Sequence, residues 1–114
     1  MTEKLSTYDH ADISVGLGTL QKICYRVSKD HGFHDYSEVP FNVGEKLALI
    51  HSEVSEALEA VRGKPEDNNL VEELADIIIR VADLAGYMGL DLAGATTRKI
   101  EKNMGRPYKH GKNF

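Results

Sequence analysis

The segment from residue 70 to residue 88 constrains the fold more than any other part of the chain. As a helix with about 100° per residue, it gathers its charged side chains within an arc of about 100°; these are Glu72, Glu73, Asp76, Arg80 and Asp83. Apart from Tyr87, the remaining residues are Leu, Val, Ala, Ile, Gly and Met. A helix that is apolar around most of its circumference is buried on most sides. We therefore expect its one polar stripe to face water or to line a site.

Two more helices are predicted before this segment. Apolar residues at helical spacing indicate the first, from about Asp12 to about His31. The second starts after Asn42, which forms a variant of the capping box with Glu45, and it continues to about Arg62. An irregular loop that contains proline separates the two helices.

Cap patterns also bound the apolar segment and the helix that follows it. Asn69 and Glu72 repeat the cap pattern at the start of the segment, which ends near Met88. Asp91 is expected to cap a shorter fourth helix over about residues 92–103. The tail from about residue 104 contains a proline and is predicted to be extended.

These elements predict one all-α domain, residues 1–114, with about four helices and an antiparallel hairpin between the second and the third. No apolar run is long enough to cross a membrane, and the N-terminus lacks the apolar core of a secretory signal. Cys24 is the only cysteine, so the sequence offers no internal disulfide. We expect Cys24 to be buried and the protein to be cytoplasmic.

The charge is unevenly distributed along the chain. Residues 1–97 hold eight Lys and Arg against seventeen Asp and Glu, a balance of −9, whereas residues 98–114 hold six against one, a balance of +5. An acidic body argues against nucleic acid as a partner. The basic tail is either a solvated end or a place where an anion binds beside a cation held by carboxylates.

Two pairs of carboxylates lie on the two hairpin helices. Glu53 and Glu56 are three residues apart on one helix, and Glu73 and Asp76 repeat this spacing on the other, so each pair projects from one side. An antiparallel hairpin can bring the pairs together, where they repel one another unless a cation lies among them. Oxygen ligands without Cys or suitably spaced His favour Mg²⁺ or Mn²⁺.

The alternative is that these acids are solvated faces that pair with basic side chains. Asp76 and Arg80, four residues apart, are expected to form such a pair. Asp83 is a further metal ligand, a partner of Arg80 or a surface acid, and we favour the partner of Arg80.

The stretches around the carboxylates resemble a known family. "EVSE" and "EELAD" look like the Glu-x-x-Glu and Glu-x-x-Asp motifs of the MazG-like all-α nucleoside triphosphate pyrophosphohydrolases. "EKLALIHSEVSEALEA", "EELADIIIRVADLAGYMGLDL" and the ending "K…N..RPYKHGK" are similar to the smaller, phage-type members, over about residues 17–114. Some members carry one more Glu where this chain has Ser52, which leaves the number of bound metal ions open.

The resemblance implies a four-helix MazG-like bundle that assembles as a homodimer or homotetramer. It also implies hydrolysis of an NTP or dNTP to NMP and pyrophosphate, with Mg²⁺, or Mn²⁺ in its place, activating the attacking water at the α-phosphate. The implied metal ligands and catalytic residues are Glu53, Glu56, Glu73 and Asp76, with Glu53 favoured where one of them serves as general base. The implied substrate-binding residues are Lys99, Asn103, Arg106, His110 and Lys112.

Two further residues are candidates for contact with the substrate. Phe33 is a candidate for stacking on the base, and Lys46 for contact with a phosphate.

Two other classes of protein are alternatives to the enzyme. The first is a non-catalytic helical oligomerisation or interaction module, which an apolar third helix would also suit. The second is a carboxylate-bridged di-iron bundle, which requires Glu-x-x-His motifs that the sequence does not contain.

Overall fold

The computed structural model describes residues 4–114, and regular structure in this range is entirely helical, without strands. The α-helices are α1 (Thr7–Asp30), α2 (Val43–Arg62), α3 (Leu70–Met88) and α4 (Leu92–Met104). Two short 3₁₀ turns, η1 (Pro65–Asp67) and η2 (Tyr108–Gly111), follow α2 and α4. The predicted all-α class with four helices is confirmed.

The side chain at the N-cap position caps three of the helices, α1, α2 and α4. The Asn42 side chain accepts the backbone N–H of Glu45 at 3.2 Å, and Asp91 accepts that of Gly94 at 3.0 Å, as the sequence predicted. The expected start of the first helix near Asp12 is wrong. Ser6 accepts the backbone N–H of Asp9 at 3.0 Å, and this cap starts α1 upstream of its first apolar residues.

Two other local expectations are also wrong. The side chain of Asn69 does not cap α3; instead, Oδ1 of Asn68 accepts the backbone N–H of Leu70 at 2.9 Å. The tail after α4 is not simply extended, because its residues turn tightly at η2, where Lys109 and His110 both have positive φ.

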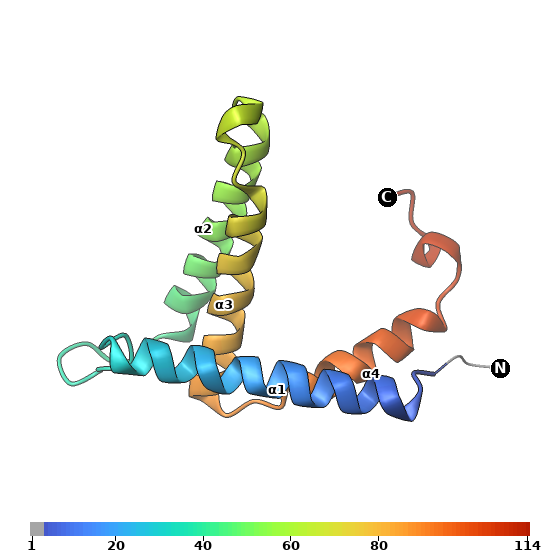
Figure 1. The fold of residues 1–114 in the computed structure, drawn as a ribbon, viewed down its shortest axis with the longest axis horizontal. Helices are drawn as coiled ribbons and strands as arrows, with labels where there is room; N and C mark the ends of the chain where they lie inside the picture. Colours follow the sequence, from blue (N-terminus) through green and yellow to red (C-terminus); the bar gives the residue numbers. More distant parts are fainter. Residues whose placement is uncertain (1–3) are drawn as a thin grey trace.

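The helices form an open arrangement (Figure 1). α2 and α3 lie side by side, run in opposite directions and are joined through η1; we call this pair the arm. α1 crosses the base of the arm and packs on α3, while α4 packs on α1. In Figure 1, α4 lies beside the other end of α1, away from the arm, and the tail extends away from α1 after the end of α4.

Small side chains allow α1 and α3 to approach closely where they cross. Ala82 and Ala85 of α3 are 1% and 4% exposed. A Cβ atom at Gly86 would lie 2.8 Å from Cβ of Tyr25 and 3.1 Å from the backbone oxygen of Gln21. This close contact fixes where the base of the arm sits on α1.

The single chain leaves much of the arm uncovered. The expectation that the third helix is buried on most sides is wrong for one copy, since Leu74, Ile78 and Ile79 are 47%, 52% and 47% exposed. The reason is that α1 covers only the base of α3 and α2 covers only one side of it (Figure 1). Cys24 is buried, as predicted. None of the described helices is long and apolar enough to cross a membrane.

Candidate functional site

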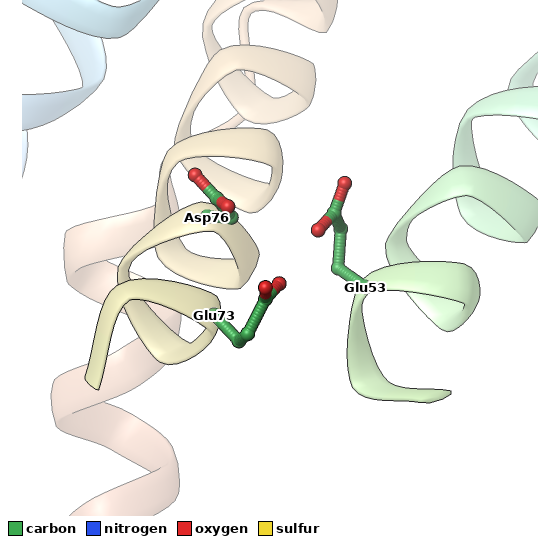
Figure 2. A group of neighbouring side chains, drawn as sticks. All are labelled: Glu53, Glu73 and Asp76. Atoms are coloured by element: carbon green, nitrogen blue, oxygen red, sulfur yellow. The ribbon is translucent and has the colours of Figure 1, made fainter. Parts of the chain in front are cut away.

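Three carboxylates from the two arm helices meet between α2 and α3. Glu53, Glu73 and Asp76 each offer one oxygen, and these oxygens lie within 4.8 Å of one another. Figure 2 shows Glu53 reaching from α2 towards Glu73 and Asp76 on α3. We call these three residues the acid cluster. Three of the four predicted ligands are therefore close together.

The acid cluster contains buried oxygens without partners. Glu53 is only 8% exposed, although it is a charged residue. Oε2 of Glu53 and Oε2 of Glu73 are both buried without a hydrogen-bond partner. An unpaired buried carboxylate oxygen is costly in free energy. A cation among the three side chains would remove this cost.

Glu56, the fourth predicted ligand, lies at the edge of the acid cluster. It is exposed and is not one of the three converging residues. The charge of Glu53, with that of Glu73, raises the pKa of the Glu56 carboxyl. The negative charge of the cluster therefore affects the pKa of Glu56, although Glu56 lies at its edge.

The basic and acidic residues of α3 do not pair as the sequence suggested. Nε of Arg80 donates to Oε1 of Glu53 at 2.8 Å, so the expected pair with Asp76 is wrong. Oδ1 of Asp83 is instead 2.6 Å from Nε2 of His34, which makes the favoured pairing of Asp83 with Arg80 wrong as well. Both expectations fail for the same reason: the partners of Arg80 and Asp83 lie on other elements and are nearer to them than the residues one turn away on α3.

His34 anchors the loop between α1 and α2 onto α3. Its side chain is 6% exposed, and its Nδ1 lies 3.2 Å from the hydroxyl of Tyr36. The rings of Tyr25, Tyr36 and Tyr87 lie around it, and Phe41 completes this aromatic group by stacking on Tyr87 with 4.6 Å between the ring centres. This group was not predicted from the sequence, although Tyr87 within the polar arc indicated that this part of α3 is covered.

A groove of about 850 Å³ opens beside the acid cluster. Apolar side chains of α1 and α3 form much of its wall, together with Phe33, Lys46, Glu53, Asp76 and Arg80. Its volume is in the range of small-molecule sites, which are concave and mostly apolar with a few polar groups. The sequence-predicted candidates Phe33 and Lys46 therefore line the same groove as two of the acids.

Cys24 also lines the groove, but it is not prepared for chemistry. Burial, with a contribution from the charge of Asp83, raises the pKa of its thiol. Because the thiolate is the form that attacks or ligates, a thiol with a raised pKa acts as a small apolar side chain.

The predicted substrate-binding residues lie elsewhere in the single chain. Lys99 and Asn103 are on α4, which packs on α1, and the tail continues from there. Figure 1 shows α4 and this tail apart from the arm that carries the acid cluster. One chain therefore does not bring these residues and the acids together; the others of this set are Arg106, His110 and Lys112.

The acid cluster is suited to a hard divalent cation. Its donors are all carboxylate oxygens, the ligand type that Mg²⁺ and Mn²⁺ prefer. Ligand oxygens lie about 2.1 Å from Mg²⁺, so two on opposite sides of the ion are about 4.2 Å apart. Small side-chain movements would bring the three oxygens into that range.

Comparison with known proteins identifies the family. The model of the MazG nucleotide pyrophosphohydrolase domain matches residues 42–110, which include α2, α3, α4 and the acid cluster. No curated protein and no solved structure matches the chain. Because the matched region spans more than half of the sequence and holds the converging carboxylates, this chain belongs to the MazG nucleotide pyrophosphohydrolase family.

Proposed function

We propose that this protein is a Mg²⁺-dependent pyrophosphohydrolase that converts a nucleoside triphosphate, ribo or deoxyribo, to its monophosphate and pyrophosphate. The acid cluster carries this proposal, because two of its buried oxygens have no partner in the absence of a cation. The family match supports the reaction class, and the adjoining groove has the volume for a nucleotide.

The acid cluster would hold the ion through Glu53, Glu73 and Asp76. When bound, Mg²⁺ would polarise the α-phosphate and lower the pKa of the attacking water. Glu53 is an unsuitable general base in this arrangement, since Arg80 holds one of its oxygens and the other belongs to the ion site. We assign the base to Glu56, which is exposed at the edge of the cluster and free of such a partner.

The groove would bind the rest of the nucleotide. Its apolar wall and Phe33 suit the base, and Lys46 is a cation on the same wall that can contact a phosphate. The binding energy of these contacts would hold the α-phosphate beside the ion, which is the positioning that phosphoryl chemistry requires.

The proposal includes a second copy of the chain. The negative charge that develops on the phosphates needs more cations than Lys46 and Arg80 supply. Lys99 and Arg106 are suitable cations and Asn103 is a suitable hydrogen-bond donor, but all three lie away from the arm of their own chain. We propose a homodimer or homotetramer in which α4 and the tail of one copy complete the site on the arm of another, covering the exposed apolar residues of α3.

Pyrophosphate release from a panel of ribo-, deoxyribo- and modified triphosphates tests the reaction. The assay compares Mg²⁺ with EDTA, for the wild type and for Glu73→Gln. We expect Mg²⁺-dependent release and a loss of at least about 100-fold in Glu73→Gln, because removal of outer partners of a metal alone costs about 10–100-fold. Glu59→Gln is the matched control, since Glu59 is on α2 with a side chain that is 70% exposed.

Each other outcome of this assay has a definite meaning. Release of single phosphate would replace the proposed reaction with another phosphohydrolase activity. No turnover of any triphosphate, with no rise in melting temperature on addition of Mg²⁺, would refute the metal site. The arm would then be better explained as the surface of a helical interaction module.

A further inference from the structure

Both glutamates with an unpaired oxygen are held through their other oxygen. In Glu53, Oε1 accepts the Nε–H of Arg80 at 2.8 Å while Oε2 is buried without a partner. In Glu73, Oε1 accepts the Nδ2–H of Asn69 at 2.9 Å while Oε2 is also buried without a partner. The two carboxylates thus repeat one arrangement with two different donors. Figure 2 shows both directed into the space between α2 and α3.

Neither donor satisfies the acid cluster by itself. Each makes one hydrogen bond to one oxygen, and Arg80 brings the single positive charge within ion-pair distance of the cluster among the described residues. Three converging carboxylates and the nearby Glu56 therefore keep an excess of negative charge. What the donors do is fix the rotation of each carboxylate, since an anchored Oε1 determines where Oε2 points.

The role of Asn69 explains why it fails as a helix cap. Asparagine is among the best N-cap residues, and Asn69 occupies the N-cap position of α3. Its side chain instead donates to Glu73, four residues along the helix. The neighbouring Asn68 takes over capping by accepting the backbone N–H of Leu70 at 2.9 Å. Asn68 thus caps the start of the helix, and Asn69 orients the carboxylate of Glu73.

We propose that Asn69 and Arg80 are positioning residues of the cation site, each anchoring Oε1 of one glutamate so that Oε2 faces the ion. This inference rests on the proposed function, because that function requires the ion. Outer partners of this kind orient ligands before the metal arrives and so increase metal affinity. The chemical class of the ligand is a hard divalent cation, for which Mn²⁺ is the spectroscopic probe.

Two variants that conserve charge test the proposal in the full chain. Asn69→Ser keeps a good N-cap residue but is too short to reach Oε1 of Glu73. Arg80→Lys keeps the positive charge but loses the planar Nε–H donor. Electron paramagnetic resonance of free Mn²⁺ during a titration gives the dissociation constant without reference to activity. We expect Mn²⁺ to bind about 10–100-fold more weakly to each variant than to the wild type.

Two neighbouring substitutions serve as matched controls. Asn68→Ala removes the cap of α3, so we expect a lower melting temperature and an unchanged Mn²⁺ affinity. Arg62→Lys changes an arginine that pairs with Glu59 at 3.4 Å on the exposed surface, and we expect it to change neither quantity. Asn69→Ser should show the reverse of Asn68→Ala, with weaker Mn²⁺ binding at an unchanged melting temperature.

The outcomes separate this proposal from the proposed function. Wild-type Mn²⁺ affinity in both Asn69→Ser and Arg80→Lys would overturn the positioning role and leave the enzyme proposal intact. A fall in affinity that accompanies a lower melting temperature in Asn69→Ser and Asn68→Ala alike would reduce the role of Asn69 to helix stability, which also overturns it. A wild-type protein that binds no Mn²⁺ would end both proposals.

Discussion

The pKa of Glu56 depends on the charges of the neighbouring carboxylates. Glu56 is solvent-exposed, yet the charges of Glu53 and Glu73 raise the pKa of its carboxyl group. A native pKa above the unfolded value means that the native state binds the proton more tightly. The resulting stabilisation is present below the unfolded pKa, about 4.5, and is lost as the pH rises through the native pKa.

This repulsion predicts opposite effects of Glu56→Gln on stability and on activity. Without divalent ions, the variant should be more stable than the wild type at neutral pH, and its stability should change less between pH 4 and pH 7. With Mg²⁺ and substrate, its activity should fall by at least about tenfold. Urea unfolding in EDTA and pyrophosphate release measure the two effects. Unchanged stability in EDTA would show that the repulsion costs nothing measurable.

At the scale of the elements, Gly86 decides how closely α1 and α3 pack. Its missing side chain leaves room for Cβ of Tyr25 and the backbone oxygen of Gln21, neither of which can move without moving α1. The buried Ala82 and Ala85 extend this narrow contact along α3. The crossing is therefore specified by small side chains and not by large interlocking ones.

Gly86→Ala should destabilise the protein, although alanine is the better helix former. Overpacking at a rigid contact costs about 1–3 kcal/mol, which exceeds the gain of up to about 1 kcal/mol in helix propensity. Gly16→Ala in α1 is the matched control, because nothing lies within 4 Å of its Cβ position. We expect this control to be stabilised by about 0.5–1 kcal/mol. Urea unfolding at one protein concentration measures both, and a stabilised Gly86→Ala would contradict the close crossing.

At the scale of the whole molecule, the single chain is more open than a compact domain. Its radius of gyration is 17.0 Å, whereas a compact domain of this length has about 13 Å. Large apolar side chains are exposed along both arm helices, among them Leu58 and Ile78 at 56% and 52%. Such surface is typical of a face that another chain covers, which is the observation behind the proposed second copy.

A mixture of two inactive variants tests whether the tail of one copy serves the arm of another. Glu73→Gln disables the acid cluster, and Arg106→Ala disables the tail. In a dimer with shared sites, a mixed pair contains one intact site, so random mixing should recover about a quarter of wild-type activity. Each variant alone is the control. No recovery, with mixed dimers present by mass spectrometry, would mean that each tail serves its own chain. Full activity of Arg106→Ala alone would mean that the tail is not used.

The sequence by itself determined the helices and the residue types of the site. Helical periodicity and the caps at Asn42 and Asp91 act within a few residues, so they could be read locally. The repeated spacing of carboxylates on two neighbouring helices likewise predicted that acids would converge. Glu53, Glu73 and Asp76 do converge, because both helices are regular and pack side by side.

Only the tertiary structure decided which side chains pair and what remains uncovered. Arg80 pairs with Glu53 of α2 and not with the acids of its own helix, and His34, in the loop between α1 and α2, pairs with Asp83. The Asn69 side chain donates to Glu73 and does not cap α3. Each choice depends on distances between elements, which local patterns do not contain. The exposed arm follows for the same reason: the apolar pattern of α3 specifies that its surface should be covered, but not whether the same chain covers it.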